Sequence, residues 1–243
     1  MSIKLKNVVP ASPEQMEFII EGMRNPMNSW EKSDSGICSI GSGIECDYCS
    51  DYASCDKTID DIYHLGLNDH SLMQRLSNAG TEHRKYMRMM PVYVRITAPL
   101  YWWKEFDTYK VGTVANSCST MHKIAEKEFT LEDFSYEHLM VFEEKRKLRF
   151  SPLGTLQNTI DELNDCRDLY LKTKDKAYWW QLIQLLPSSY NQTRNVMLNY
   201  EVLANIYRQR KNHKLDEWRE FCKWIESLPY KELITGVEEC QTL

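Results

Sequence analysis

One segment of the sequence places polar side chains at both ends of an apolar helical stripe. Asn199, Leu203, Ile206 and Arg210 follow one another at spacings of four, three and four residues, so on a helix they would share one face. At a rise of about 1.5 Å per residue, the two polar residues would lie roughly 16 Å apart along that face, a span that suits an elongated ligand. The same pattern fits a helix that packs its apolar middle into the core, and periodicity alone favours this second interpretation.

A second candidate is the polar segment from Val111 to Ser119, which follows an apolar strand and an aromatic helix. Hydroxyl groups of Thr113, Ser117 and Ser119, together with backbone N–H groups, are the donors that hold an anion in many loops. Most loops of this composition are solvated turns. Composition therefore leaves both interpretations open.

Four of the eight cysteines fall in one short segment, at Cys38, Cys46, Cys49 and Cys55. Four thiolates can close a tetrahedral zinc site or hold an iron–sulfur cluster, and the C-x-x-C pair at Cys46 and Cys49 is a common half-site. The flanking spacings, with seven and five intervening residues, match no standard zinc ribbon. Structural thiols in a reducing compartment are the competing interpretation, ahead of disulfides.

The elements that must position these groups are mostly helices, with two strands. A strand at 3–9 leads to a helix that begins at Ser12 and Pro13 and ends near Met23. Alternating apolar residues predict a strand from Val92 to Pro99. We expect a loop at 25–56, which could include a short strand, and a second loop at 111–119. A charged strand or exposed connection is expected at 143–150, and helices at 69–79, 100–109, 121–127, 156–170, 178–186, 193–210 and 215–227.

Composition narrows the class of protein. With 243 residues, 42% of them hydrophobic and 27% charged, the chain has the composition of an ordinary globular protein, and we expect a single domain. A net charge of −5 argues against nucleic acid as a partner. The apolar runs are too short to cross a bilayer and the first residues lack a signal-peptide core, so we expect a soluble, cytoplasmic protein.

A longer pattern around the polar loop is similar to that of a known family. The run ITAPLYWWKEFDTYKVGTVANSCSTM at 96–121 resembles the signature of the flavin-dependent thymidylate synthases, where Ala-Pro and an aromatic helix precede Arg-His-Arg-x-x-Ser-x-x-x-x-Ser-x-Arg. The segment TEHRKYMRM at 81–89 and the segment LPSSYNQTRNVMLNYEVLANIYRQRKNHKLDEW at 186–218 resemble two further family segments in the same order. The resemblance covers roughly residues 67–225.

The resemblance implies a fold of α/β class, thymidylate synthase-complementing-protein-like and helix-rich with a central sheet. In the family this fold forms a homotetramer, with FAD and dUMP bound where subunits meet. The cysteine-rich loop at about 31–58 is an insertion relative to the family pattern. In that family, reduced flavin passes a methylene group from methylenetetrahydrofolate to dUMP, and NADPH supplies the hydride. No protein thiol attacks the pyrimidine, so we expect Cys118 to be a small buried thiol. By position, the resemblance implies a catalytic role for Arg210 and cofactor contacts from His83, Tyr109, Lys110, Val111, Asn116 and Asn199.

Uncharged residues replace three arginines of the family pattern. Thr108 and Thr120 stand where the family has arginine, and Ile183 takes the place of a third arginine. Because a nucleotide phosphate needs several charge-assisted donors, these departures leave three functions open. The chain could catalyse the family reaction, act on a different pyrimidine, or serve as a non-catalytic scaffold that binds a partner or metabolite.

Overall fold

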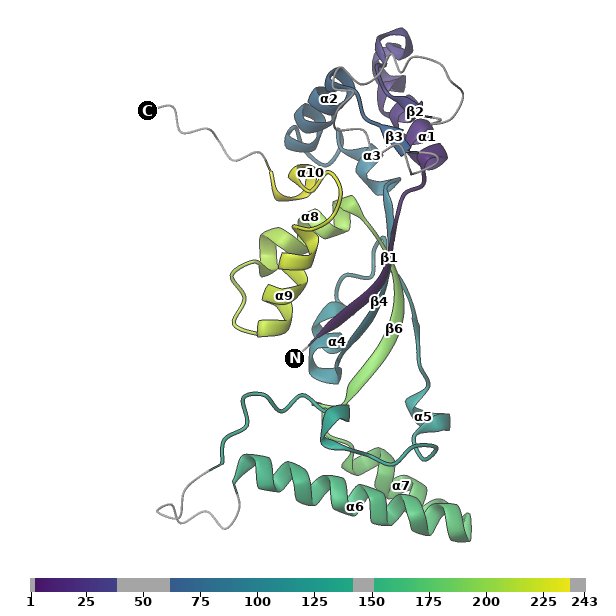
Figure 1. The fold of residues 1–243 in the computed structure, drawn as a ribbon, viewed down its shortest axis with the longest axis vertical. Helices are drawn as coiled ribbons and strands as arrows, with labels where there is room; N and C mark the ends of the chain where they lie inside the picture. The colour runs from purple at the N-terminus through teal and green to yellow at the C-terminus, as the bar shows by residue number, and fades with distance from the viewer. Residues whose placement is uncertain (1–2, 39–61, 142–150, 237–243) are drawn as a thin grey trace. The chain divides into compact units, whose positions relative to one another are not determined.

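The computed structural model describes residues 3–38, 62–141 and 151–236, and mixes helices and strands along the chain as the predicted α/β class requires (Figure 1). The first elements are β1 (Lys4–Pro10), α1 (Pro13–Arg24), η1 (Asn25–Met27), η2 (Trp30–Lys32), β2 (Gly36–Cys38), β3 (Ile62–His64), α2 (Leu67–Asn78), α3 (Lys85–Arg88), β4 (Pro91–Pro99) and α4 (Leu100–Phe106). They are followed by β5 (Val114–Ser117), α5 (Thr120–Lys123), η3 (Leu131–Asp133), α6 (Pro152–Thr173), α7 (Lys176–Leu185), β6 (Asn191–Asn199), α8 (Tyr200–Arg210), α9 (Asp216–Ile225) and α10 (Glu232–Thr235).

Contacts divide the chain into two compact units, each assembled from separate segments. Unit 1 comprises the described parts of Met1–Lys6, Arg95–Thr108 and Ala115–Val196, and unit 2 those of Asn7–Val94, Tyr109–Val114 and Met197–Leu243. A four-stranded sheet has the order β1-β4-β6-β5, and β2 pairs antiparallel with β3 so that Cys38 lies opposite Ile62. Within the described residues, no helix is both long enough and apolar enough to cross a membrane.

Helix ends in unit 2 form where the sequence predicts them. Ser12 caps α1 through a capping box, in which its Oγ accepts from the Gln15 N–H at 3.3 Å and Gln15 Oε1 accepts from the Ser12 N–H at 2.9 Å. Pro13 occupies the first turn, as expected. The helix α2 stops before Gly80, whose φ of 118° is open to glycine and unfavourable for other residues.

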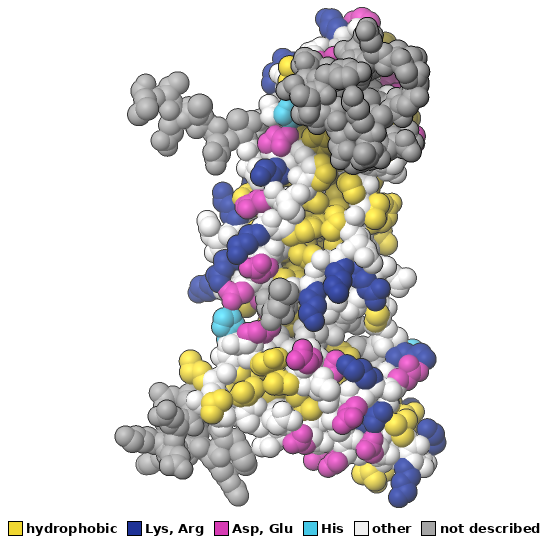
Figure 2. Space-filling model, in the orientation of Figure 1, with side chains coloured by type: hydrophobic (Ala, Val, Ile, Leu, Met, Phe, Trp, Pro, Cys, Tyr) yellow, Lys and Arg dark blue, Asp and Glu magenta, His cyan; other side chains and the backbone are white. Residues whose placement is uncertain are grey.

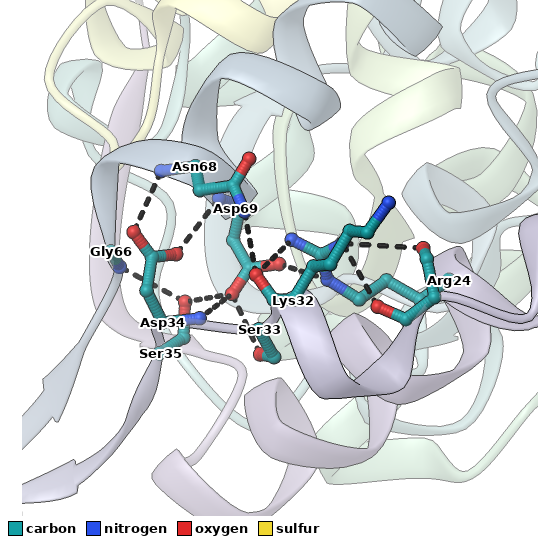
Figure 3. Close-up of polar contacts among 9 residues, drawn as sticks. Arg24, Lys32, Ser33, Asp34, Ser35, Gly66, Asn68 and Asp69 are labelled. Carbon is teal, nitrogen blue, oxygen red and sulfur yellow. Dashed lines mark hydrogen bonds and ion pairs between the residues drawn. The ribbon is translucent and has the colours of Figure 1, made fainter.

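A buried ion pair joins α1 to α2 in unit 2 (Figure 3). Arg24 Nε donates to Asp69 Oδ1 at 2.6 Å, and the side chains of Arg24 and Asp69 are only 3% and 0% exposed. The other Asp69 oxygen accepts from the hydroxyls of Ser33 and Ser35, each at 2.7 Å, and from the Asp34 N–H at 3.0 Å. Burial alone would raise the pKa of Asp69, but hydrogen bonds from Ser35, Ser33 and Arg24 outweigh it and lower that pKa.

Asp34 fixes the first turn of α2 from a distant part of the sequence. Its two carboxylate oxygens accept from the N–H groups of Asn68 at 2.8 Å and Asp69 at 3.0 Å (Figure 3). The N-cap residue of α2 is Gly66, which has no side chain with which to satisfy these donors. The segment before β2 therefore acts as a cap for a helix that begins more than thirty residues later.

Unit 1 is built on the helical hairpin α6–α7 and on the aromatic helix α4. Leu163 and Leu182, each 0% exposed, belong to a core cluster that includes Phe129, Phe134 and Ile160. In α4, the rings of Trp102, Trp103 and Phe106 are at most 2% exposed and pack on one another with centroid distances of 4.9–5.2 Å. The aromatic residues of this segment therefore fill the chain's own core.

Three predicted elements differ clearly in the structure. The helix expected at 121–127 is the short α5, which ends at Lys123. The helix expected at 193–210 begins only at Tyr200, because Gln192, Val196 and Leu198 are buried with the alternation of a strand, which is β6. The loop expected at 111–119 contains the strand β5, which pairs with β6 at the edge of the sheet. The charged segment at 143–150 lies outside the described residues.

Candidate nucleotide groove

The start of α8 forms one wall of an open groove in unit 2. The groove has a volume of about 650 Å³, and its lining includes Arg88, Gly112, Asn199, Glu201, Asn205 and Arg208. This volume falls within the 300–1,000 Å³ that is common for small-molecule sites. The lining contains two guanidinium groups, two amides and one carboxylate, a donor-rich set suited to an anionic, hydrogen-bonding ligand.

The side chain of Asn199 shapes the groove by contacting backbone groups on α8 and by lying close to Gly112. It is 9% exposed and is the N-cap of α8, with its Oδ1 accepting from the Val202 N–H at 3.0 Å. Gly112 adopts a φ of 82°, and a Cβ there would lie 2.8 Å from Asn199 Nδ2 and 2.9 Å from Val202 Cγ2. The loop can approach α8 this closely because residue 112 has no side chain.

Charged groups on the groove are distributed unevenly. Arg88 forms a bidentate ion pair with Glu201, in which Nη2 donates to Oε1 at 3.2 Å, and it also donates to the Thr81 carbonyl at 3.3 Å. The Arg88 side chain is 51% exposed and that of Glu201 is 17% exposed. Arg208 is exposed on α8. An anion could therefore reach Arg208 directly, whereas it must compete with Glu201 for Arg88.

Arg210, the predicted catalytic residue, lies in an aromatic cluster of unit 2. Its Nε donates to the Tyr109 hydroxyl at 2.8 Å, and its guanidinium carbon lies 4.7 Å from the ring centroid of Trp218. The Tyr109 hydroxyl in turn donates to Gln209 Oε1 at 2.9 Å, and the rings of Tyr109 and Trp218 are 8% and 0% exposed. Arg210 is not among the residues that line the described groove. These contacts connect α8 to α9.

The other predicted cofactor contacts have different surroundings. Val111 lines the groove beside Gly112 and is 92% exposed. Lys110 is exposed, and His83 lies in an exposed turn with Nε2 3.7 Å from Glu82 Oε1. Asn116 is exposed on β5 and belongs to unit 1. The structure therefore brings Val111 and Asn199 together, and the roles of all seven residues remain predictions.

Two of the three departures from the arginine pattern have structural roles in unit 1. Ile183 packs against the hydrophobic core cluster between α6 and α7, a place where an arginine would need a partner for its charge. The hydroxyl of Thr108 donates to the Glu105 carbonyl at 2.7 Å, at the end of α4. Thr120 is the first residue of α5. At 183 and 108 the substituted side chains therefore serve the fold of this chain.

The cysteines give one correction and one open prediction. Cys118 was expected to be buried but is exposed, because it follows the edge strand β5, with its N–H donating to the Thr193 carbonyl at 2.9 Å. Cys46, Cys49 and Cys55 lie outside the described residues, and only the backbone of Cys38 is described. Among the described side chains, no group of three or more His, Cys, Asp or Glu is placed to hold a metal. The four-cysteine site therefore stays a prediction.

Seven of the nine lining residues were missed by the sequence analysis: Thr81, Arg88, Gly112, Glu201, Val202, Asn205 and Arg208. Val202, Asn205 and Arg208 follow at intervals of three residues along α8 and all line the groove. That spacing places them on one face of the helix, beside the face of Leu203 and Ile206, which are both buried. In the sequence, the polar residues Asn205 and Arg208 were the signal that could have identified this face of α8 as part of a site.

Comparison with known proteins identifies the fold. No protein-family model matches the chain, and no curated protein matches its sequence. Among solved structures, the chain is similar to the flavin-dependent thymidylate synthase ThyX of Helicobacter pylori complexed with FAD and dUMP, with 16% identity over 97% of this chain and 98% of that one and a TM-score of 0.57. A second structure of that enzyme with FAD and dUMP gives 14% identity, 97% coverage of both chains and a TM-score of 0.58.

A third similar structure is the UMP/dUMP methylase PolB of Streptomyces cacaoi bound with 5-Br dUMP, with 12% identity, coverage of 96% of this chain and 95% of that one, and a TM-score of 0.55. Each likeness extends over nearly the whole of both chains at low identity. Such a likeness fixes the arrangement of the backbone and leaves the chemistry to the residues of the site. The chain has the fold of the flavin-dependent thymidylate synthases.

Proposed function

We propose that the chain is a flavin-dependent thymidylate synthase-like protein that binds FAD and a pyrimidine nucleotide, with the groove at the start of α8 as part of the site. The observation that carries this proposal is the donor-rich groove itself, in a fold whose similar solved structures hold FAD and dUMP. Fold alone would leave the function open. The groove supplies the local chemistry that a nucleotide needs.

The groove residues fit a flavin nucleotide by their chemistry. Arg208 would form a charge-assisted hydrogen bond with a phosphate, and Asn205 would donate to or accept from a ring amide or a sugar hydroxyl. Val111, being 92% exposed at the groove, offers an apolar surface to a planar ring. Gly112 keeps the loop close to α8 without a Cβ. When bound, the flavin would supply hydride transfer chemistry.

Reductive methylation of dUMP to dTMP, with methylenetetrahydrofolate and NADPH, is the reaction that we propose to test first. One observation favours the alternative that the chain is a non-catalytic or substrate-switched homologue. Arg210 is already bonded to Tyr109 and stacked on Trp218, and Ile183 packs in the core of unit 1. Two positions that the resemblance links to substrate binding thus have structural contacts within the chain.

The test combines a spectrum with two titrations. Flavin bound to the purified protein would give visible absorption bands, and FAD and dUMP would be titrated separately by calorimetry. Arg208→Gln should weaken binding of at least one of them by about tenfold or more, since a hydrogen bond to a charged group contributes about 1.5–3 kcal/mol. Arg75→Gln is the matched control, because Arg75 is exposed on α2 and does not line the groove.

Each result of this test has a definite meaning. Absence of binding of both FAD and dUMP would refute the proposal. Binding without formation of dTMP in the complete assay would favour the non-catalytic or substrate-switched homologue. Equal affinities in Arg208→Gln and wild type would show that the ligand occupies a different site.

We also propose a homotetramer, as the resemblance implies. The rings of α4 are buried within the chain, so subunit contacts would rely on other apolar groups, such as Val111 and Val114, which are 92% and 62% exposed. Light scattering at micromolar concentration measures the assembly. A monomer under these conditions would contradict the proposal.

A further inference from the structure

A second groove, in unit 1, combines cations with aromatic rings. It has a volume of about 460 Å³ and lies beside the turn between α6 and α7, with Lys174, Lys176, His122, Tyr170 and Trp179 in its lining. We call it the basic groove. None of its described lining residues is Asp or Glu. Figure 2 shows Lys or Arg side chains next to hydrophobic ones over the C-terminal end of α6.

The backbone that carries the two lysines is held by helix caps. Lys174 adopts a left-handed conformation with a φ of 59°, and its N–H donates to the Tyr170 carbonyl at 2.8 Å, which ends α6. Asp175 caps α7 by accepting from the Ala177 N–H at 2.9 Å. The Asp175 carboxylate therefore caps α7. Lys174 and Lys176, on either side of Asp175, extend from a backbone that these caps fix.

The aromatic wall of the basic groove rests on the core of unit 1. Tyr170 and Trp179 pack against the cluster that contains Ile124 and Ala125, which also line the groove. Trp179 Nε1 donates to the Met121 carbonyl at 3.2 Å, which fixes the indole against the segment of α5. The rings are therefore held in place before any ligand arrives, and such preorganisation lowers the entropic cost of stacking.

The lysine amines and the aromatic rings of the basic groove lie close enough together to contact one small ligand. The amine of Lys176 lies over the ring of Trp179, 5.9 Å from its centroid, and the amine of Lys174 lies over the ring of Tyr170, 5.8 Å from its centroid. A phosphate that draws the two amines toward itself would uncover these ring faces for a base. A phosphate carries a charge near −2 and accepts charge-assisted hydrogen bonds from ammonium groups, while a base stacks on an aromatic side chain. We infer that the basic groove binds a nucleoside monophosphate, with its phosphate at Lys174, Lys176 and His122 and its base against the aromatic wall.

This inference concerns unit 1 and does not rest on the proposed function of the groove in unit 2. The experiment is a calorimetric titration of the full chain with UMP, uridine and inorganic phosphate as separate probes. To reduce the contribution of unit 2, every titration is repeated in the Arg208→Gln background. Lys174→Gln/Lys176→Gln is the test variant, and Lys172→Gln is the control, because Lys172 is exposed on α6 but does not line the basic groove.

We expect UMP to bind in the Arg208→Gln background and the double lysine variant to weaken that binding at least tenfold, with Lys172→Gln within twofold of its parent. Uridine and phosphate alone should each bind at least tenfold more weakly than UMP, because each uses half of the site. The inference is overturned if UMP does not bind at millimolar concentration, if the double variant binds it as well as the parent, or if phosphate alone matches UMP. Circular dichroism of the double variant verifies that the α6–α7 hairpin is intact.

Discussion

Replacing Asp69 with Asn tests the buried ion pair in unit 2. In the wild type, Arg24 Nε donates to Asp69 Oδ1, and three donors from residues 33–35 point at Oδ2. An Asn side chain that turns its oxygen toward those three donors would direct its NH₂ group at Arg24. The guanidinium, 3% exposed, would then lose its counter-charge. Breaking one side of a buried pair costs about 3–5 kcal/mol.

We therefore expect Asp69→Asn to lower the free energy of unfolding by about 3–5 kcal/mol and the melting temperature by about 6–20 °C, at 2–4 °C per kcal/mol for a chain of this size. Urea denaturation followed by circular dichroism measures the first quantity. Asp168→Asn is the control, since Asp168 is 72% exposed in its pair with Arg167, and an exposed pair of this kind contributes about 0–1 kcal/mol.

We also predict how the stability difference between wild type and Asp69→Asn depends on pH. Because the pKa of Asp69 is lowered in the folded protein, its carboxylate stabilises the fold above the unfolded-state pKa of about 3.9, and this stabilisation is lost as the pH falls toward the lower folded value. The difference between wild type and Asp69→Asn should thus be constant near neutrality and shrink below about pH 4. A loss at pH 7 no larger than that of Asp168→Asn would refute the reasoning.

Three further predictions concern the sites. Gly112→Ala should lower the free energy of unfolding by about 2–4 kcal/mol, because of the positive φ and the overlap of the new Cβ with Val202. It should also weaken nucleotide binding in the calorimetric assay described above. Wild-type affinity and stability in this variant would show that the loop adapts. Arg210→Ala should lower the melting temperature by about 4–8 °C, because it loses about 2 kcal/mol of contacts to Trp218 and its neighbours. Wild-type stability combined with lost ligand binding would instead support a catalytic role for Arg210. If the four-cysteine segment binds metal, elemental analysis should find about one equivalent of zinc per chain, or the iron of one cluster. The Cys49→Ser variant should lose this metal. A metal-free wild-type protein would leave the cysteines as structural thiols.

The sequence predicted most elements correctly because their patterns are local. The cap at Ser12 and the alternation in Val92–Pro99 each involve neighbouring residues, and both appear in the structure. The start of α8 was misplaced because helical periodicity in Leu203 and Ile206 was extended backwards past Asn199. An Asn that accepts from the N–H three residues later is a frequent helix start, and β6 could have been separated from α8 on that basis.

The candidate site was only partly predictable, because its residues come together through contacts distant in sequence. Asn199 was identified from its spacing and from the family resemblance, Val111 from the resemblance alone, and both line the groove. Arg88 and Glu201 form an ion pair across 113 positions of sequence, and no local pattern indicates it. The exposure of Cys118 depended on β5 lying at the edge of the sheet, which is again a property of the tertiary structure.

The pairing of β2 with β3 has a consequence for protein engineering. Gly36 lies opposite His64 and Cys38 opposite Ile62, and Asp34 is bonded to the first turn of α2, so the chain is anchored on both sides of residues 39–61. Lengthening the chain between two fixed ends has a small cost in closure entropy, about 0.6 kcal/mol for each doubling of its length. A folded guest domain whose termini lie close together could thus be grafted between these two strands, and its presence should leave the remainder of unit 2 in register.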